Sequence, residues 1–204
     1  NTAYMMAMGK SGKVLPQRPF LIVDEAHQLA NNMMSFHSLT VSQRMLEKLF
    51  RLPTQQDISN AKSEKKKDIY RKQREIVLKE FDGKGSFGLP KLQSMTLNTP
   101  LPTRKQALQK LGRYLFALRD EIKSKMKEKD AQTKYDKKEL SYASNSVARI
   151  DDLLGSIATD WENWVYQVDE NNEYPTWIAF KPLDVSAYAD ELLLNLGQQR
   201  IMMS

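Results

Sequence analysis

Two adjacent carboxylates stand directly after a short apolar run in this sequence. The run from Phe20 to Val23 is typical of a β-strand covered on both faces, and Asp24 and Glu25 follow it. In an open α/β sheet, such a strand delivers the side chains at its carboxyl end into the crevice where phosphate groups bind. Asp24 is then placed to hold Mg²⁺, a hard cation with oxygen ligands, with Glu25 as a second candidate ligand. Glu25 is also placed to polarise a water molecule that attacks a γ-phosphate, so these residues indicate nucleotide hydrolysis.

His27 completes the four-residue motif Asp-Glu-Ala-His. The pattern gives no reason to count His27 as a metal ligand, and we expect it to couple the nucleotide state to a neighbouring segment. A four-residue match is weak evidence by itself, but its position between an apolar strand and a helix start at Gln28 strengthens it. The alternative is a strand followed by a solvated acidic turn.

The composition is that of a globular protein that can bury a core. The chain has 204 residues, of which 41% are hydrophobic and 27% charged. It has no cysteine, which excludes disulfides and thiolate metal sites within it, and its two histidines, His27 and His37, are too isolated for a zinc site. No apolar run is long enough to cross a bilayer. We therefore expect a soluble, intracellular protein, cytoplasmic or nucleoid-associated, without membrane contact.

The basic residues are concentrated in one part of the chain. Residues 57–138 include 22 Lys and Arg against 11 Asp and Glu, whereas the remainder has 9 against 14. Such asymmetry is typical of a surface that binds a polyanion. For any single lysine, the alternative is a solvated side chain balanced by a nearby glutamate. The candidate nucleic-acid contacts are Lys65, Lys66, Lys67, Arg71, Lys105, Arg113, Lys123 and Lys127.

The middle of the chain has the apolar spacing of helices. Residues 41–52 and 57–81 are expected to form amphipathic helices, and the glycines of residues 82–90 suggest a mobile loop after them. A capping box of Thr103 and Gln106 predicts the start of a long helix. Its apolar stripe, Leu108, Leu111, Leu115, Leu118, Ile122 and Met126, is expected to pack against a helix around residues 147–157 as a helical hairpin.

The last part of the chain changes to strand periodicity. Alternating apolar residues predict a β-hairpin over residues 161–180, with its turn at 169–172. A helix capped by Ser186 and stopped by Gly197 should follow, and then a strand over residues 200–204. The chain is thus predicted to be an α/β fold with a mainly α-helical insertion and a small β-hairpin, helix-dominated overall.

Three parts of this sequence resemble the XPD/DinG-type branch of superfamily 2 DNA helicases. They are residues 23–29 around the Asp-Glu-Ala-His motif, the upstream Asn1-Thr2-Ala3-Tyr4, and residues 180–186 together with 201–204. The resemblance implies a RecA-like P-loop motor domain that is interrupted by a helical insertion called the arch. The domains that it implies are 1–40, part of motor domain 1 with the motif; 41–160, the arch-like insertion; and 161–204, a hairpin, helix and strand that return to motor domain 1.

The resemblance also implies roles for individual residues. Asp24 and Glu25 fall on the Mg²⁺ and water-activating positions of the family's motif II, His27 on its coupling position, and Ser204 on the first residue of its Ser-Ala-Thr motif III. The implied cofactors are ATP and Mg²⁺, and many relatives also carry a 4Fe-4S cluster on four upstream cysteines. The implied partner is single-stranded or forked DNA, along which the motor moves from 5′ to 3′. Both ends of the chain look cut from a longer polypeptide and the P-loop is missing, so we expect the chain alone to be inactive.

A non-enzymatic module is the competing hypothesis. In that case the basic helices bind nucleic acid or a partner protein, and the Asp-Glu-Ala-His match is incidental. Exposed Leu or Met side chains on the stripe from Leu108 to Met126 would favour a protein partner, because a large apolar patch marks such a site.

Overall fold

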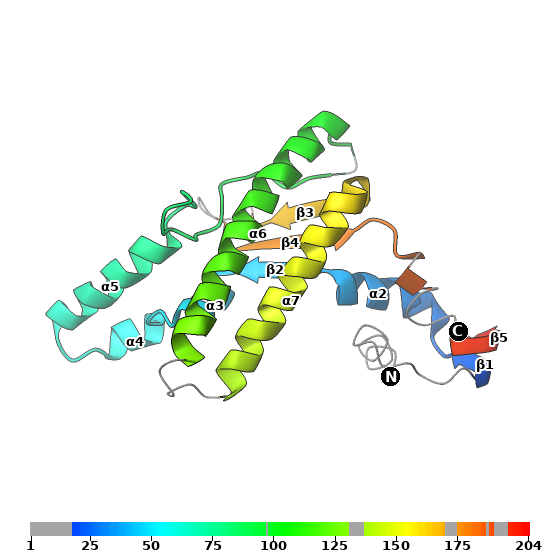
Figure 1. The fold of residues 1–204 in the computed structure, drawn as a ribbon, viewed down its shortest axis with the longest axis horizontal. Helices are drawn as coiled ribbons and strands as arrows, with labels where there is room; N and C mark the ends of the chain where they lie inside the picture. The colour runs from blue at the N-terminus through cyan, green and yellow to red at the C-terminus, as the bar shows by residue number, and fades with distance from the viewer. Residues whose placement is uncertain (1–17, 97, 131–136, 170–174, 187, 190–195) are drawn as a thin grey trace. The chain divides into compact units, whose positions relative to one another are not determined.

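The computed structural model describes residues 18–96, 98–130, 137–169, 175–186, 188–189 and 196–204 (Figure 1). The fold is mixed α/β, and more than half of the described residues are helical. The chain divides into two compact units, one formed by Asn1–Ser38 with Lys181–Ser204 and the other by Leu39–Phe180. The units are therefore described one at a time.

The first unit contains a small parallel sheet. Strand β1 (Arg18–Val23) pairs with β5 (Gly197–Met202), and Val23 lies opposite Met202. The 3₁₀ helix η1 (Ala26–Gln28) and helix α2 (Leu29–His37) follow β1. His37 ends α2, where its ring stacks on that of Tyr188 with centroids 4.0 Å apart.

The apolar run of β1 was predicted to be buried on both faces, but only alternate residues are buried. Leu21 and Val23 are buried against Leu29 and its neighbours, whereas Phe20 and Ile22 are more than half exposed. Strand alternation places these two pairs on opposite faces, so among the described residues only one face of β1 is packed. The expectation of burial on both faces is therefore wrong for this part of the chain.

Gly197 has a different role from the predicted helix stop. It begins β5, and a Cβ added to it would lie 2.4 Å from the Cβ of Leu21 in β1. The close approach of the two strands therefore requires glycine here. Ser186 was predicted to cap the helix before Gly197. The structure instead shows the Asp184 carboxylate as the acceptor, and it receives the backbone N–H of Ser186 at 2.9 Å. The rest of that helix lies mainly outside the described residues.

The second unit has a three-stranded antiparallel sheet in the order β2-β4-β3. Strands β3 (Trp164–Val168) and β4 (Trp177–Pro182) are the predicted pair, and the 3₁₀ helix η2 (Trp161–Asn163) precedes them. Most of the predicted turn between them lies outside the described residues. An extended piece is predicted over residues 35–40, but α2 continues to His37, and the third strand is β2 (Leu39–Ser42), which runs antiparallel to β4.

Two long helices cover this sheet and confirm the predicted helical hairpin. Helices α6 (Leu101–Asp130) and α7 (Lys137–Asp160) run across it in Figure 1, and their apolar faces share one core with the strands. The predicted capping box is wrong, because α6 begins at Leu101 and Thr103 already lies in its first turn. The core combines the stripe of α6 with inward side chains of α7, β3 and β4, including Leu108, Leu111, Leu115, Leu118, Ile150, Trp164, Ile178 and Phe180.

Three shorter helices replace the two that were predicted before α6. They are α3 (Gln43–Phe50), α4 (Gln55–Asn60) and α5 (Glu64–Leu78). Helix α3 starts later than predicted because β2 includes the first two residues of the predicted helix. It ends at Phe50, and the next residue, Arg51, has a left-handed conformation. The predicted helix over 57–81 is broken because the Ser63 hydroxyl caps α5.

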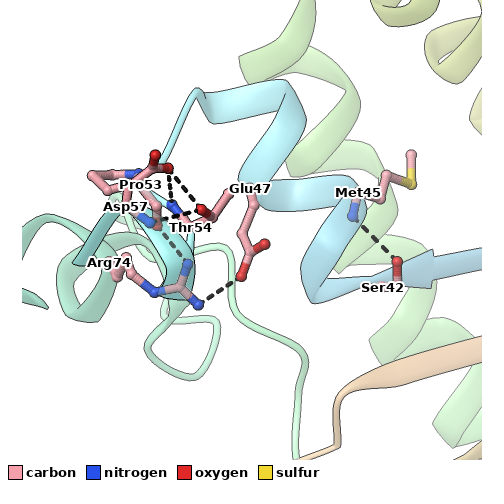
Figure 2. A network of polar contacts seen from close by, with 7 residues as sticks. All are labelled: Ser42, Met45, Glu47, Pro53, Thr54, Asp57 and Arg74. Carbon is pink, nitrogen blue, oxygen red and sulfur yellow. Dashed lines mark hydrogen bonds and ion pairs between the residues drawn. The ribbon is translucent and has the colours of Figure 1, made fainter. Parts of the chain in front are cut away.

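A polar network joins α5 to α3 and to the loop before α4 (Figure 2). Arg74 of α5 donates to the Glu47 carboxylate of α3 at 2.6 Å and to the Pro53 carbonyl at 2.6 Å. Next to it, Thr54 and Asp57 form a reciprocal capping box at the start of α4. The Arg74 side chain is only 11% exposed, so this charge is held by fixed protein partners rather than by water.

The second half of the glycine-containing segment after α5 is packed rather than a loose loop. Its backbone returns along the end of α5, with the N–H of Phe87 bonded to the Val77 carbonyl at 2.8 Å. Phe87 is buried, and the Tyr114 hydroxyl of α6 donates to its carbonyl at 3.1 Å. Burial raises the pKa of the Tyr114 phenol, which keeps this hydroxyl protonated as a donor. Residues 86–90 are therefore buried in their unit, whereas residues 82–85, which include Gly83 and Gly85, are exposed.

Candidate functional site

The predicted catalytic residues lie at the carboxyl end of β1. Because β1 and β5 are parallel, this end shares an edge of the small sheet with the end of β5. Two hydrogen bonds continue the pairing beyond the strands: the Met203 N–H donates to the Val23 carbonyl at 2.9 Å, and the Ala26 N–H to the Met203 carbonyl at 2.8 Å. Asp24 and Ser204 therefore both follow directly on paired residues at one sheet edge.

Glu25 occupies a turn that is costly for a residue with a side chain. Its φ of 53° and ψ of 44° are left-handed, a conformation that it shares with only one other non-glycine residue, Arg51, in the described part of the chain. The Asp24 carboxylate accepts the Glu25 N–H at 2.9 Å, and the Glu25 carbonyl accepts the Gln28 N–H at 2.8 Å. Such strain costs roughly 1 kcal/mol or more and is commonly found at functional sites.

The turn brings Glu25 and His27 together. His27 Nδ1 lies 3.2 Å from Glu25 Oε2, and each side chain is 58% exposed. The sequence predicts separate roles for these residues and gives no sign of this contact. A group that binds or releases the Glu25 carboxylate therefore also changes the environment of the His27 ring.

The donor set at this edge fits a hard divalent cation. Asp24 and Glu25 supply carboxylate oxygens, and no cluster of three or more His, Cys, Asp or Glu side chains suited to a metal occurs within the described residues. Mg²⁺ is usually bound through one or two carboxylates, with water and phosphate oxygens as its other ligands. Two exposed carboxylates thus fit a hydrated Mg²⁺ that is shared with a phosphate. The chain has no cysteine and cannot hold a 4Fe-4S cluster.

The sequence lacks a complete P-loop. Residues Gly9-Lys10-Ser11 have the end of the signature, but Tyr4 stands where the signature needs its first glycine. This segment lies outside the described residues. The phosphate-binding half of a nucleotide site is therefore not identified in the chain.

The eight basic candidates divide between α5 and α6, and their surroundings differ. Lys67, Arg71 and Lys123 are in ion pairs with Glu64, Asp68 and Asp151, at 2.6, 2.9 and 3.0 Å. Lys66 and Lys105 lie over the rings of Tyr70 and Trp161, each with Nζ 5.5 Å from the ring centroid. Within the described part of the chain, Lys65, Arg113 and Lys127 are exposed and have no ion pair.

The apolar stripe of α6 is buried, and the opposite face of the helix carries an exposed aromatic residue. Leu108 to Ile122 of the stripe are buried and Met126 is partly buried, so the stripe is not an apolar surface for a partner. Sequence reasoning missed Phe116, an aromatic residue that lies off the stripe and is 53% exposed. Its helical position, one residue after Leu115, would have placed it on the outer face.

Comparisons with known proteins add no family assignment. No protein-family model matches the chain, and a search of the curated proteins finds no match. Among the described helices, none is long and apolar enough to cross a membrane.

Proposed function

We propose that this chain is a segment of an ATP-dependent DNA helicase that moves from 5′ to 3′ on single-stranded DNA. The observation that carries the proposal is the position of Asp24 and Glu25, which follow β1 at the edge that β1 shares with the parallel strand β5. Nucleotides bind at the carboxyl ends of parallel strands in open α/β sheets. The small parallel sheet is accordingly assigned to a RecA-like motor domain.

The two carboxylates divide the work of hydrolysis. Asp24 is assigned to Mg²⁺, which when bound neutralises phosphate charge and orients the triphosphate. Glu25 accepts a proton from the attacking water while the oxygen of that water bonds to the γ-phosphorus. The bond between the γ-phosphorus and the bridging oxygen breaks, and ADP leaves with its electron pair. The exposure of both side chains leaves them accessible to such a substrate.

His27 and Ser204 are assigned to coupling. His27 Nδ1 contacts the Glu25 carboxylate, so a nucleotide that binds at Glu25 changes the contact between these two side chains. Ser204 follows Met203, whose backbone is bonded to both Val23 and Ala26 on either side of the two carboxylates. A change at this turn therefore reaches the segment after β5 through backbone hydrogen bonds.

Residues 41–160, within the unit Leu39–Phe180, are assigned to the arch-like insertion that contacts or gates the DNA. Its basic surplus is the support for this role, and Lys65, Arg113 and Lys127 are among its exposed cations. A non-enzymatic module that binds nucleic acid or a partner protein is the alternative, and it requires no hydrolysis.

Substitution of Glu25 in the full-length protein tests the proposal. Glu25→Gln should leave binding of Mg²⁺-ATP within about twofold and lower the rate of hydrolysis by at least about 100-fold, because only proton transfer is lost. The matched control is Glu75→Gln, the same change at an exposed site of α5. Near-normal turnover in Glu25→Gln would remove Glu25 from the role of base.

A further inference from the structure

Phe116 is an aromatic ring held in place on the outer face of α6. It is 53% exposed, although Leu115 and Leu118 beside it in sequence are fully buried. The guanidinium of Arg119 covers one face of the ring, with its Cζ 4.0 Å from the ring centroid. Arg119 is itself fixed by Asp120 and Asp151, at 2.7 and 3.0 Å. The ring is therefore preorganised, and the protein covers it on one face with a cation.

A hollow open to solvent adjoins this ring. It has a volume of about 550 Å³ and is lined by Gln109, Gly112, Arg113 and Phe116. A Cβ added to Gly112 would meet nothing within 4 Å, so no atom of the described structure requires glycine there. Glycine inside a helix costs about 1 kcal/mol relative to alanine. Gly112 thus lowers the stability of α6 at the position where a larger side chain would fill the hollow.

The lining of the hollow carries one cation, Arg113, and no carboxylate, and the nearby Asp120 and Asp151 are paired with Arg119. The first 19 residues of α6, residues 101–119, include five Lys and Arg and no Asp or Glu. Lys105, Gln109, Gly112 and Phe116 follow one another at helical spacing along one line, with Arg113 beside it. Arg113 is exposed and lines the hollow directly. An aromatic ring among these cations is complementary to a planar base on an anionic backbone.

We propose that this face of α6 binds single-stranded nucleic acid, with one base stacked on Phe116 in the hollow beside Gly112 and Arg113 on an adjacent phosphate. A paired base within a duplex is stacked on both sides and cannot lie on the ring, which selects single strands. The inference rests on the proposed helicase function and gives it a contact site for its DNA. Binding here needs neither Asp24 nor Glu25, so it can fail while the hydrolysis assignment stands, and the reverse also holds.

Fluorescence anisotropy with two labelled 20-mers tests the proposal on the 204-residue chain. One probe is oligo(dT), and the other is an abasic oligonucleotide with the same number of phosphates. Phe116→Ala should weaken binding of oligo(dT) by roughly 5- to 150-fold, the usual effect of losing one stacked base, and leave the abasic probe within about twofold. Arg113→Ala should weaken both probes and lower the salt dependence by about one phosphate contact.

A leucine at position 116 distinguishes base stacking from a purely apolar contact. Phe116→Leu keeps an apolar side chain without a π face and should bind oligo(dT) as weakly as Phe116→Ala. Full affinity in Phe116→Leu would overturn base stacking in favour of an apolar contact. Absence of wild-type binding to both probes would overturn the site as a nucleic-acid contact.

Filling the hollow provides a matched pair. Gly112→Leu should weaken oligo(dT) binding, whereas Gly155→Leu, at a comparably open glycine of α7, should not. Equal binding by the two variants would contradict the assignment of the hollow. Circular dichroism and urea unfolding of each variant confirm that the helices are intact.

Discussion

Arg74 is expected to contribute strongly to the stability of the unit Leu39–Phe180. Its side chain is 11% exposed and that of Glu47 is 19% exposed, so the pair is largely removed from water. Arg74→Ala removes two hydrogen bonds and leaves the Glu47 carboxylate and the Pro53 carbonyl without this donor. Bonds to charged groups contribute about 1.5–3 kcal/mol, and breaking a fully buried pair costs about 3–5 kcal/mol. For this partly exposed pair we expect a loss of about 2–3 kcal/mol.

Urea unfolding followed by tryptophan fluorescence measures this loss. All three tryptophans, Trp161, Trp164 and Trp177, lie in Leu39–Phe180, so the signal reports that unit. With an m value of about 2 kcal/mol/M, the midpoint should fall by about 1 M urea. In a Glu47→Gln background, Arg74→Ala should cost at least about 1 kcal/mol less, because the stranded carboxylate is absent.

Arg71→Ala is the matched control, three residues earlier in the same helix. Arg71 pairs with Asp68 at 2.9 Å, but both side chains are more than half exposed, so its removal should cost less than about 0.5 kcal/mol. A midpoint shift for Arg74→Ala no larger than that for Arg71→Ala would refute the reasoning from burial.

Two further predictions concern the backbone and the helix caps of the same unit. A Cβ at Gly88 would lie 2.0 Å from the Leu78 carbonyl oxygen, so Gly88→Ala should destabilise by at least about 1–3 kcal/mol, whereas Gly155→Ala should be neutral or stabilising in the same urea assay. Hydrogen bonds from the Thr54 side chain and backbone lower the pKa of Asp57, so their stabilising effect is present above about pH 4 and is lost as pH falls through the lowered pKa. Urea midpoints between about pH 5 and pH 2.5 should therefore fall less steeply for Asp57→Asn than for the wild type, and parallel curves would contradict this.

The elements with a long apolar repeat, or with a clear boundary in sequence, could be predicted from the sequence. The leucine stripe of α6 repeats over several turns, so its burial and the pairing with α7 follow from spacing alone. The strand at β1 followed from four apolar residues before two carboxylates. The break between α4 and α5 is also readable from the sequence, because Thr54 with Asp57, and Ser63 with Glu64 in the first turn, are start signals of helices. The spacing of the apolar residues favours one continuous helix, and the prediction followed that spacing.

Other features depend on residues that are distant in sequence or on backbone conformation. Strand β2 has four residues, and its partner β4 begins 135 positions after the end of β2, at Trp177, so local propensity indicated an extended piece nearby but neither its bounds nor its partner. The bond between Arg74 and Glu47 spans 27 positions. The left-handed turn at Glu25, which brings its carboxylate to His27, occurs at a residue type that gives no signal for it.

The measurement that tests the central claim most directly is the sequence of the reading frame on either side of the codons for Asn1 and Ser204. We expect a Gly-Lys-Thr or Gly-Lys-Ser P-loop before Asn1 and Ala-Thr directly after Ser204, because a motor domain needs a phosphate cradle and a complete motif III. A frame with neither feature would contradict the helicase assignment and leave a basic helical module that binds nucleic acid or a partner protein.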